Sequence, residues 1–367
     1  MGEKMHVAIV GAGAIGCSLA AGLSEQGRQV TLVGRGEQVA AINRDGLLLR
    51  DRQGRARRYG LHAVEALAER PDLVLLTVKT QDVAGACRDI APYVAGVPVV
   101  AMQNGVQGDH IAAGVLGRAA IVGAVVMSAA TYLRPGEVSV EFPGWLIVGE
   151  PFGPATRRTR AIVSLLNRCV PTYLTDRLAA VRWSKLISNL NNALSAATGL
   201  TLTEIVDTIE GHALPVWVMQ EGYRAMRASG AELDHGLYGL TPRALRRDPN
   251  AALIALLQAG MTTMLATLPE RAAIAALGAA SRSRLNRLPI RGSTWQSIAR
   301  GRPSEIDYLN GEIVRLGERL NLPTPFNRHL VALVHQVEAS HTFYPVEALL
   351  PPDPTRATAA ATVGATR

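Results

Sequence analysis

From its sixth residue the chain reads His6-Val7-Ala8-Ile9-Val10-Gly11-Ala12-Gly13-Ala14-Ile15-Gly16. The four apolar residues before Gly11 predict a strand buried on both faces, and the alanine- and leucine-rich segment 17–23 predicts a helix. Between them stands the spacing Gly-x-Gly-x-x-Gly. A first glycine permits a tight turn, a second lets the backbone approach a pyrophosphate, and a third lets the helix pack on its strand. The stretch therefore predicts a dinucleotide-binding α/β domain, with a glycine-rich turn in an unrelated α/β domain as the alternative.

The phosphates of such a dinucleotide are expected on the backbone amides at the start of the helix. This expectation makes six consecutive residues the predicted core of the cofactor site: Gly11, Ala12, Gly13, Ala14, Ile15 and Gly16.

The second predicted strand, 29–33, ends in Gly34-Arg35-Gly36, and the first acidic residue after it is Glu37. Many NAD enzymes place a carboxylate at this point to bind the ribose hydroxyls. A guanidinium there fits a 2′-phosphate instead, so Arg35 favours NADP(H) over NAD(H). A solvent-facing arginine is the alternative.

Two further predicted strands, 72–77 and 97–102, deliver Lys79 and Asn104 just beyond their carboxyl ends. Ligands of doubly wound sheets bind there, so both residues are predicted to face cofactor or substrate, with plain loop residues as the alternative. The segment 47–58 reads as a polar hairpin, and strands 120–126 and 145–148, separated by a Pro135-Gly136 turn, are expected to complete the sheet. A helix over 156–169 then closes the domain.

The chain has 367 residues, with 48% hydrophobic and 19% charged residues, which suits a globular protein of two domains. We expect a dinucleotide-binding domain over 1–175, a helical domain over 176–340 and a disordered tail over 341–367. No secretory signal is visible before the first strand. The apolar stretches 119–133 and 251–268 read as strand and buried helix, so no membrane partner is expected.

The formal net charge is +8, but the basic residues are scattered and aromatic residues make up only 4% of the chain. A nucleic-acid partner is therefore not expected, whereas an anionic cofactor and substrate suit this balance. The three cysteines, Cys17, Cys87 and Cys169, lie far apart in the sequence and form no metal or redox spacing. No metal site is predicted, and a reducing cytoplasm is the expected setting.

Lysine is rare in this chain. Of 38 lysine and arginine residues, only Lys4, Lys79 and Lys185 are lysines. A buried lysine can shift its pKa and exchange a proton, which arginine cannot do near neutral pH. A lysine retained at Lys185 therefore suggests proton transfer, against ordinary sequence drift as the alternative.

The second half of the chain predicts a run of helices. A helix over 182–197, stopped by Gly199, places Lys185, Asn189 and Asn192 on one face, where a polar stripe suggests a binding surface rather than a solvated face. A later helix begins near Pro303-Ser304 and carries Glu305 in its first turn, where the helix dipole alone would favour a carboxylate. Its predicted core residues are Ile306, Leu309, Ile313, Leu316 and Leu320. A last helix is expected over 326–337.

These motifs together resemble the ketopantoate reductase family over about residues 5–337. The resemblance rests on Gly11 to Gly16, Val78-Lys79-Thr80, Gln103-Asn104-Gly105, the segment Trp183 to Asn189, and Ser293 with the block Ser304 to Gly311. It implies an N-terminal Rossmann-type α/β domain and an all-α C-terminal domain of the 6-phosphogluconate dehydrogenase C-terminal-like kind. It also implies NADPH-dependent reduction of 2-dehydropantoate to pantoate, on the route to pantothenate and coenzyme A.

Carried over by position, the resemblance implies that Lys185 is the catalytic lysine and that Asn189, Asn192 and Ser293 bind the substrate. It implies that Lys79 and Asn104 lie along the ribose and nicotinamide of the cofactor. Glu305 would close the site near the hydroxyl groups of cofactor and substrate.

Three features depart from the family pattern. Asn192 stands seven residues after Lys185, where the family usually has an asparagine at eight, and Ala193 follows it. Val140 to Gly144 replaces a common His-x-Gly, and the region 230–290 and the tail are long. The exact 2-oxo acid and the oligomeric state therefore stay open, and a homodimer through the helical domain is the arrangement we consider. A reductase of another 2-oxo acid and a non-catalytic NADP(H)-binding sensor are the alternatives.

Overall fold

The computed structural model describes residues 5–234, 249, 260–281 and 292–352. By their mutual contacts, residues 5–182 belong to one compact unit, and residues 183–234, 260–281 and 292–352 belong to a second. The division lies inside helix α6 (Leu178–Asn189), seven residues beyond the boundary expected at 175. The predicted loop near 241 and the predicted helical segments 235–248, 250–259 and 282–291 lie outside the described residues.

The N-terminal unit is built on an eight-stranded sheet in the order β12-β11-β8-β7-β6-β1-β2-β5, in which only the β8–β11 pair is antiparallel. Its strands are β1 (His6–Val10), β2 (Gln29–Val33), β5 (His62–Val64), β6 (Leu73–Leu76), β7 (Val99–Ala101), β8 (Ile121–Val126), β11 (Leu146–Gly149) and β12 (Thr172–Leu174). The predicted strands 7–10, 29–33, 72–77, 97–102, 120–126 and 145–148 are confirmed to within two residues at each end.

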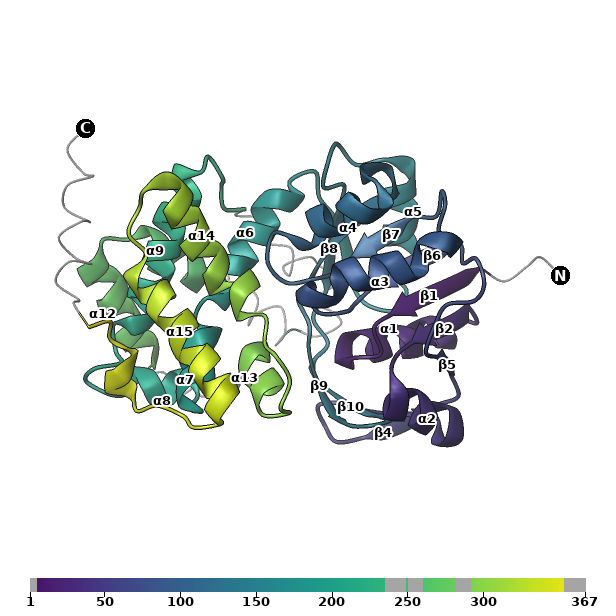
Figure 1. The fold of residues 1–367 in the computed structure, drawn as a ribbon, viewed down its shortest axis with the longest axis horizontal. Helices are drawn as coiled ribbons and strands as arrows, with labels where there is room; N and C mark the ends of the chain where they lie inside the picture. Colours follow the sequence, from purple (N-terminus) through teal and green to yellow (C-terminus); the bar gives the residue numbers. More distant parts are fainter. Residues whose placement is uncertain (1–4, 235–248, 250–259, 282–291, 353–367) are drawn as a thin grey trace. The chain divides into compact units, whose positions relative to one another are not determined.

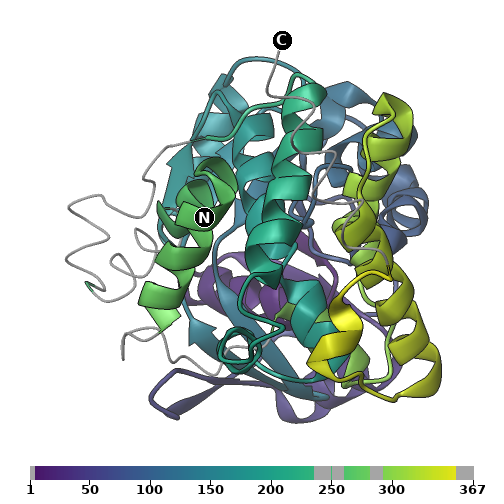
Figure 2. The same cartoon turned by 90° about the vertical axis from the view of Figure 1, so that its left-hand side faces the viewer.

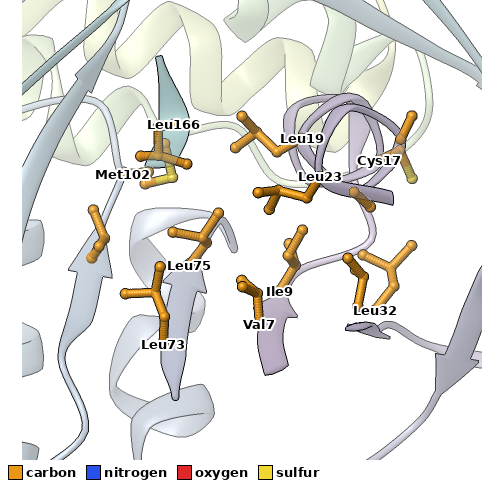
Figure 3. Close-up of a cluster of buried hydrophobic side chains, with 14 of the residues drawn as sticks. Val7, Ile9, Cys17, Leu19, Leu23, Leu32, Leu73, Leu75, Met102 and Leu166 are labelled. Carbon is orange, nitrogen blue, oxygen red and sulfur yellow. The ribbon is translucent and has the colours of Figure 1, made fainter. Parts of the chain in front are cut away.

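Helices cover both faces of this sheet (Figure 1). They are α1 (Ala14–Glu25), α2 (Gly36–Asp45), α3 (Val83–Ile90), α4 (Gly108–Leu116) and α5 (Arg157–Leu166), with short 3-10 turns η1 (Thr80–Asp82), η2 (Ala91–Tyr93) and η3 (Arg118–Ala120). Alternate residues of β1 serve the two faces: Val7 and Ile9 pack with α1 and α5, and Ala8 and Val10 pack with α3 and α4. Figure 3 shows the first of these cores, in which Leu19 and Leu23 of α1 lie over Val7 and Ile9.

A second sheet of four strands has the order β4-β3-β10-β9. Its strands are β3 (Leu47–Arg50), β4 (Ala56–Tyr59), β9 (Ala129–Arg134) and β10 (Glu137–Phe142). The hairpin expected over 47–58 is confirmed. The Pro135-Gly136 turn joins β9 to β10, so it does not simply separate two strands of the main sheet as expected. The hairpin was missed because its apolar residues merge with those of β8 in one continuous run.

In the C-terminal unit, the described residues form helices and no strand. Its helices are the later part of α6, α7 (Asn192–Thr198), α8 (Leu202–Val206), α9 (Leu214–Ala228), α12 (Glu270–Ser281), α13 (Ser293–Ile298), α14 (Asn310–Leu320) and α15 (Pro325–Ser340), with 3-10 turns η5 (Ile306–Tyr308) and η6 (Val346–Leu349). The last two long helices, drawn in yellow-green, pack side by side (Figure 2). The helix expected over 326–337 is confirmed.

Two expectations for this unit are wrong. Leu320 is 37% exposed, unlike Ile306, Leu309, Ile313 and Leu316, because α14 ends there. The expected tail begins too early, because residues 341–352 pack on this unit: Val346 and Leu349 are buried, and the amide of Tyr344 donates to the carbonyl of Ala197 at 2.9 Å. The prediction of disorder followed from the many prolines and alanines of this segment and gave too little weight to the apolar residues among them. Residues 353–367 lie outside the described part of the chain.

Candidate functional site: the nucleotide half and the helical half

The glycine turn after β1 is tightly packed at its first and third glycines. Gly11 has φ +123°, and a Cβ on it would lie 2.6 Å from the backbone nitrogen of Val78. A Cβ on Gly16 would lie 2.0 Å from the carbonyl oxygen of Gly11. Both positions therefore require glycine, one for the turn and one for the close approach of α1 to its strand.

The middle glycine has the opposite environment. Gly13 is exposed, and a Cβ on it would have no heavy atom within 4 Å in the protein. Its neighbour Ala12 is buried against Gly34, while Ala14 and Ile15 begin α1. The first amides of α1 have no carbonyl one turn earlier within the helix, so they are available to an anion. The turn thus offers open space and donors where a pyrophosphate would be held, which fits a dinucleotide.

The turn lies where the strand order reverses. β1 pairs with β2 on one side and with β6 on the other, and chain connections run outward in both directions. The hydroxyl of Thr77, just after β6, donates to the Gly11 carbonyl at 2.8 Å. Ligands of open α/β sheets bind at the carboxyl ends of strands at such a switch point. Gly11 and Thr77 therefore lie where open α/β sheets commonly bind a ligand.

Lys79 and Asn104 leave neighbouring strands at this same edge. The hydroxyl of Thr80 lies 3.4 Å from the Asn104 carbonyl, and the Gln103 side-chain amide donates to the carbonyl of Leu76 at 2.8 Å. The loops after β6 and β7 are therefore bonded to each other, as β6–β7 pairing requires. Both predicted residues lie at the carboxyl edge of the sheet.

Arg35 is the N-cap residue of α2, directly after β2 and Gly34. Its side chain is 85% exposed, and its Nη2 lies 3.6 Å from Asp82 Oδ1. A pair this exposed is weak, so an incoming phosphate competes with it readily.

The sequence did not predict a buried arginine behind the loop after β7. Arg182 is 3% exposed and donates to the carbonyls of Gln103 at 2.8 Å and Ala101 at 3.1 Å, and to Asp109 Oδ1 at 2.7 Å. It anchors the backbone next to Asn104. In a chain with scattered arginines, no local signal distinguishes this one from a surface residue.

The helix expected over 182–197 is interrupted. α6 ends at Asn189 and α7 begins at Asn192, so Lys185 and Asn189 share one helix but Asn192 starts the next. The single polar face predicted for these three residues is therefore wrong. Gly199 does end α7, with φ +72°. The periodicity missed the break because Leu190 and Asn191 carry no helix-breaking signal.

Asn192 and Ser293 are brought close together in the C-terminal unit. α13 packs against α7, and a Cβ on Gly292 would lie 2.4 Å from Asn192 Cγ. Ser293 follows Gly292 directly and begins α13. These two predicted substrate-binding residues are far apart in the sequence, but they begin adjacent helices.

Glu305 is 4% exposed and precedes the 3-10 turn η5, so its expected place in the first turn of the long helix is wrong. The alternative explanation of this carboxylate by the helix dipole therefore does not apply. Its segment is fixed from α15. The amide of Ser304 donates to Glu338 at 2.7 Å, and His335 lies 3.0 Å from Asp307 and 3.3 Å from Glu338. Partial burial lowers the pKa of His335, but the hydrogen bonds and charges of both carboxylates outweigh it and the pKa is raised.

Family models match both halves of the chain. The model described as ketopantoate reductase PanE/ApbA matches residues 7–152, and its C-terminal counterpart matches residues 177–338. The chain belongs to the ketopantoate reductase family. This match confirms the resemblance seen in the sequence and the predicted fold of an α/β domain followed by a helical domain. The family consists of pyridine-nucleotide oxidoreductases.

Curated relatives match this chain over nearly its whole length. The 2-dehydropantoate 2-reductase of Pyrococcus horikoshii is 26% identical over 338 residues, covering 91% of this chain and 98% of that protein. That of Mesorhizobium japonicum is 27% identical, covering 93% and 100%. A PanE/ApbA family ketopantoate reductase from Ralstonia eutropha JMP134 has a similar structure, with TM-score 0.72, 31% identity and coverage of 91% and 99%.

The fold is also that of a D-mandelate dehydrogenase solved with NADH and anilino(oxo)acetate, with TM-score 0.73, 22% identity and coverage of 92% and 99%. At that identity the likeness concerns the fold alone. Across the described part of this family member, no helix is long and apolar enough to cross a membrane.

Proposed function

We propose that this chain uses NADPH to reduce the ketone of 2-dehydropantoate to the hydroxyl of pantoate, on the route to pantothenate and coenzyme A. The observation that carries the proposal is the glycine turn at the β1–β6 switch point. Gly13 is open there, Gly11 and Gly16 are closely packed, and Lys79 and Asn104 follow the adjacent strands. The substrate is supported by relatives named 2-dehydropantoate 2-reductase, which match 91% and 93% of the chain.

The preference for NADPH rests on Arg35. It follows β2 and Gly34, where a 2′-phosphate is bound in doubly wound folds, and its exposed guanidinium makes a weak contact with the Asp82 carboxylate. Gly11, Ala12, Gly13, Ala14, Ile15 and Gly16 would hold the pyrophosphate through backbone amides. Lys79, Asn104 and Glu305 complete the proposed cofactor site.

A bound dihydronicotinamide would supply the hydride that forms the new C–H bond at the ketone carbon, and negative charge would develop on the carbonyl oxygen as the π pair moves to it. Lys185 Nζ donates a proton to that oxygen, giving the hydroxyl of pantoate and a neutral amine. Asn189, Asn192 and Ser293 hold the substrate so that the ketone faces Lys185, and this positioning contributes alongside acid catalysis.

A second candidate is the reduction of another 2-oxo acid. The observation that favours it is the α6–α7 junction, where Asn192 stands seven residues after Lys185 and is followed by Ala193. If a substrate-binding asparagine is displaced by one residue, the part of the site that binds the side chain of the 2-oxo acid has a different shape.

The test measures NADPH oxidation by the purified full chain with a panel of 2-oxo acids. The panel contains 2-dehydropantoate and 2-oxo acids with straight, branched and aromatic side chains. The proposal expects the highest kcat/KM with 2-dehydropantoate. Preference for another member selects the second candidate. Tight NADPH binding without oxidation by any 2-oxo acid refutes both and favours a nucleotide-binding sensor.

We also propose that the protein acts in the cytoplasm and that it forms a homodimer through the helical domain. All three cysteines are free, which suits a reducing compartment. Sedimentation equilibrium of the full chain tests the dimer, and a monomer at micromolar concentration contradicts it.

A further inference from the structure

The junction between α6 and α7 separates two residues of the proposed substrate site, Asn189 and Asn192. Backbone bonding tightens across it: the Ala193 amide donates to the Leu190 carbonyl at 3.3 Å, and the Leu194 amide donates to the Asn191 carbonyl at 3.2 Å. These are bonds between residues three apart, where an uninterrupted α-helix has bonds between residues four apart. The Leu190 carbonyl therefore lies at the break itself.

A side chain from a distant segment binds this carbonyl. Asn310 is fully buried, and its Nδ2 donates to the Leu190 carbonyl at 3.0 Å and to Asn327 Oδ1 at 2.9 Å. Both partners are acceptors, so they fix which end of the Asn310 amide is the nitrogen. Asn310 thus connects the start of α14 to the break that precedes α7.

The orientation of this contact is set one step further back. Asn327 is fully buried, and its Nδ2 donates to Glu221 Oε1 at 2.8 Å and to the Val218 carbonyl at 3.2 Å, so its Oδ1 faces Asn310. Glu221 also accepts the amides of Phe326 at 3.0 Å and Asn327 at 2.8 Å. Asn310 Nδ2 therefore donates on both sides, to the Leu190 carbonyl and to Asn327 Oδ1, while Asn327 Nδ2 donates to the Glu221 carboxylate.

This buried polar arrangement lowers the stability of the fold relative to apolar side chains, so a gain in stability does not explain it. Asn310 Oδ1 is buried and has no hydrogen-bond partner among the described residues. Leaving a buried acceptor unsatisfied costs free energy, and an apolar side chain would avoid it. Burial also raises the pKa of Glu221 to about 7, although the amides it accepts act in the opposite direction. The side chains are better explained by the geometry they impose.

Asn192 is held on its other side as well. Its side chain occupies the space next to Gly292, so α13 and the Leu190–Asn310 contact together fix where α7 begins. A change at either place would move Asn192 relative to Asn189 and Lys185.

We propose that Asn310, oriented by Asn327 and Glu221, is a positioning residue that fixes the break between α6 and α7 and thereby sets Asn192 against Asn189 and Lys185 for the 2-oxo acid. This role rests on the proposed function. Asn310 itself need not touch substrate or cofactor.

The test compares Asn310→Ala with a matched control, Gln220→Ala. Gln220 is also a buried amide of the C-terminal unit that donates to two backbone carbonyls, those of Leu265 at 3.1 Å and Leu268 at 2.9 Å, but neither belongs to the break. In the full-length enzyme, Asn310→Ala should raise KM for the 2-oxo acid about tenfold and lower kcat, with the Kd for NADPH changed less than about twofold. Both variants should lower Tm by similar amounts, because each loses a buried amide that donates two hydrogen bonds. In Gln220→Ala, however, kcat and KM should change less than about twofold.

Amide hydrogen exchange supplies a readout that needs no substrate. Exchange at Ala193 and Leu194 should accelerate in Asn310→Ala and not in Gln220→Ala. If Asn310→Ala does not fold, Asn310→Ser, which keeps a shorter donor, is measured in the same way and should show a smaller change in the same direction.

Unchanged exchange at the break, or equal kinetic losses in the two alanine variants, overturns the proposal. If the wild-type chain reduces no 2-oxo acid, the proposed function fails separately, and the exchange comparison still decides whether Asn310 holds the break.

Discussion

The two halves of the proposed site are held in different ways. In the N-terminal unit, Gly11, Gly16 and Thr77 are fixed by the backbone of adjacent parallel strands. In the C-terminal unit, the start of α7 and the segment around Ser304 are fixed by side chains from α14 and α15, some more than a hundred residues away. The first half is held by close backbone packing between neighbouring strands and the second by buried polar side chains. We therefore expect substitutions to act differently in the two halves.

The largest expected effect is at Lys185, in the half held by side chains. Lys185→Ala should lower kcat by roughly 10²–10⁴, because both the charge and the transferable proton are lost. Lys185→Arg keeps the charge but cannot donate a proton near neutral pH, so it should recover little of the rate. Steady-state kinetics across pH at saturating NADPH measures this.

Extensive recovery in Lys185→Arg would mean that charge alone stabilises the developing oxyanion. A near-wild-type kcat in Lys185→Ala would remove the residue from the mechanism. Because the phosphates are expected on the glycine turn, NADPH binding should survive in both variants.

A second prediction concerns coenzyme choice in the half held by backbone. Arg35→Ala should weaken NADPH binding by about 1.5–3 kcal/mol, the value of a charge-assisted bond to phosphate, and leave NADH binding nearly unchanged. Arg44→Ala is the matched control, since Arg44 is exposed on the same helix α2 and pairs with its neighbour Asp45. Fluorescence titration of both coenzymes measures the difference, and equal losses for the two coenzymes would contradict the assignment.

The glycine turn itself separates packing from binding. Gly16→Ala places a methyl group against the Gly11 carbonyl and should cost about 1–3 kcal/mol of stability. Gly13→Ala meets no protein atom and should cost less than about 1 kcal/mol, while raising KM for the nucleotide. Urea unfolding and nucleotide kinetics on both variants check this, and a Gly13→Ala variant with normal nucleotide KM would refute the pyrophosphate position.

The smallest effect concerns the contacts that hold the Ser304 segment. The raised pKa of His335 means that its ion pairs with Asp307 and Glu338 stabilise the fold fully below about pH 6.5, and that this contribution is lost as pH rises through the raised pKa. Because the histidine side chain is 45% exposed, the contribution should not exceed about 1 kcal/mol. Wild type should therefore be more stable than His335→Gln at pH 6 and equal to it at pH 9, by urea unfolding. A difference that persists at pH 9 would show that the pairing charge is not the cause.

The difference between the halves also explains what the sequence could predict. The strands β1, β2, β6, β7 and β8 and the turn at Gly11 follow from short apolar runs and glycine spacing, both of which are local. The break after Asn189 does not, because Leu190 and Asn191 are compatible with a helix and the side chain at the break comes from Asn310. The same holds for Arg182, whose burial depends on carbonyls of β7 and the following loop. Residue types at the proposed site were predictable, but their mutual arrangement in the C-terminal unit was not.

The burial of Arg182 determines where this chain can be divided into fragments. A fragment ending at residue 175, the boundary expected from the sequence, would lack the arginine that pairs with Asp109, which is 3% exposed. An unpaired buried carboxylate costs about 3–5 kcal/mol, a large part of the stability of a domain this size. Proteolysis or truncation near that point should therefore yield an aggregation-prone N-terminal piece, whereas a piece that retains α6 keeps its buried charge neutralised.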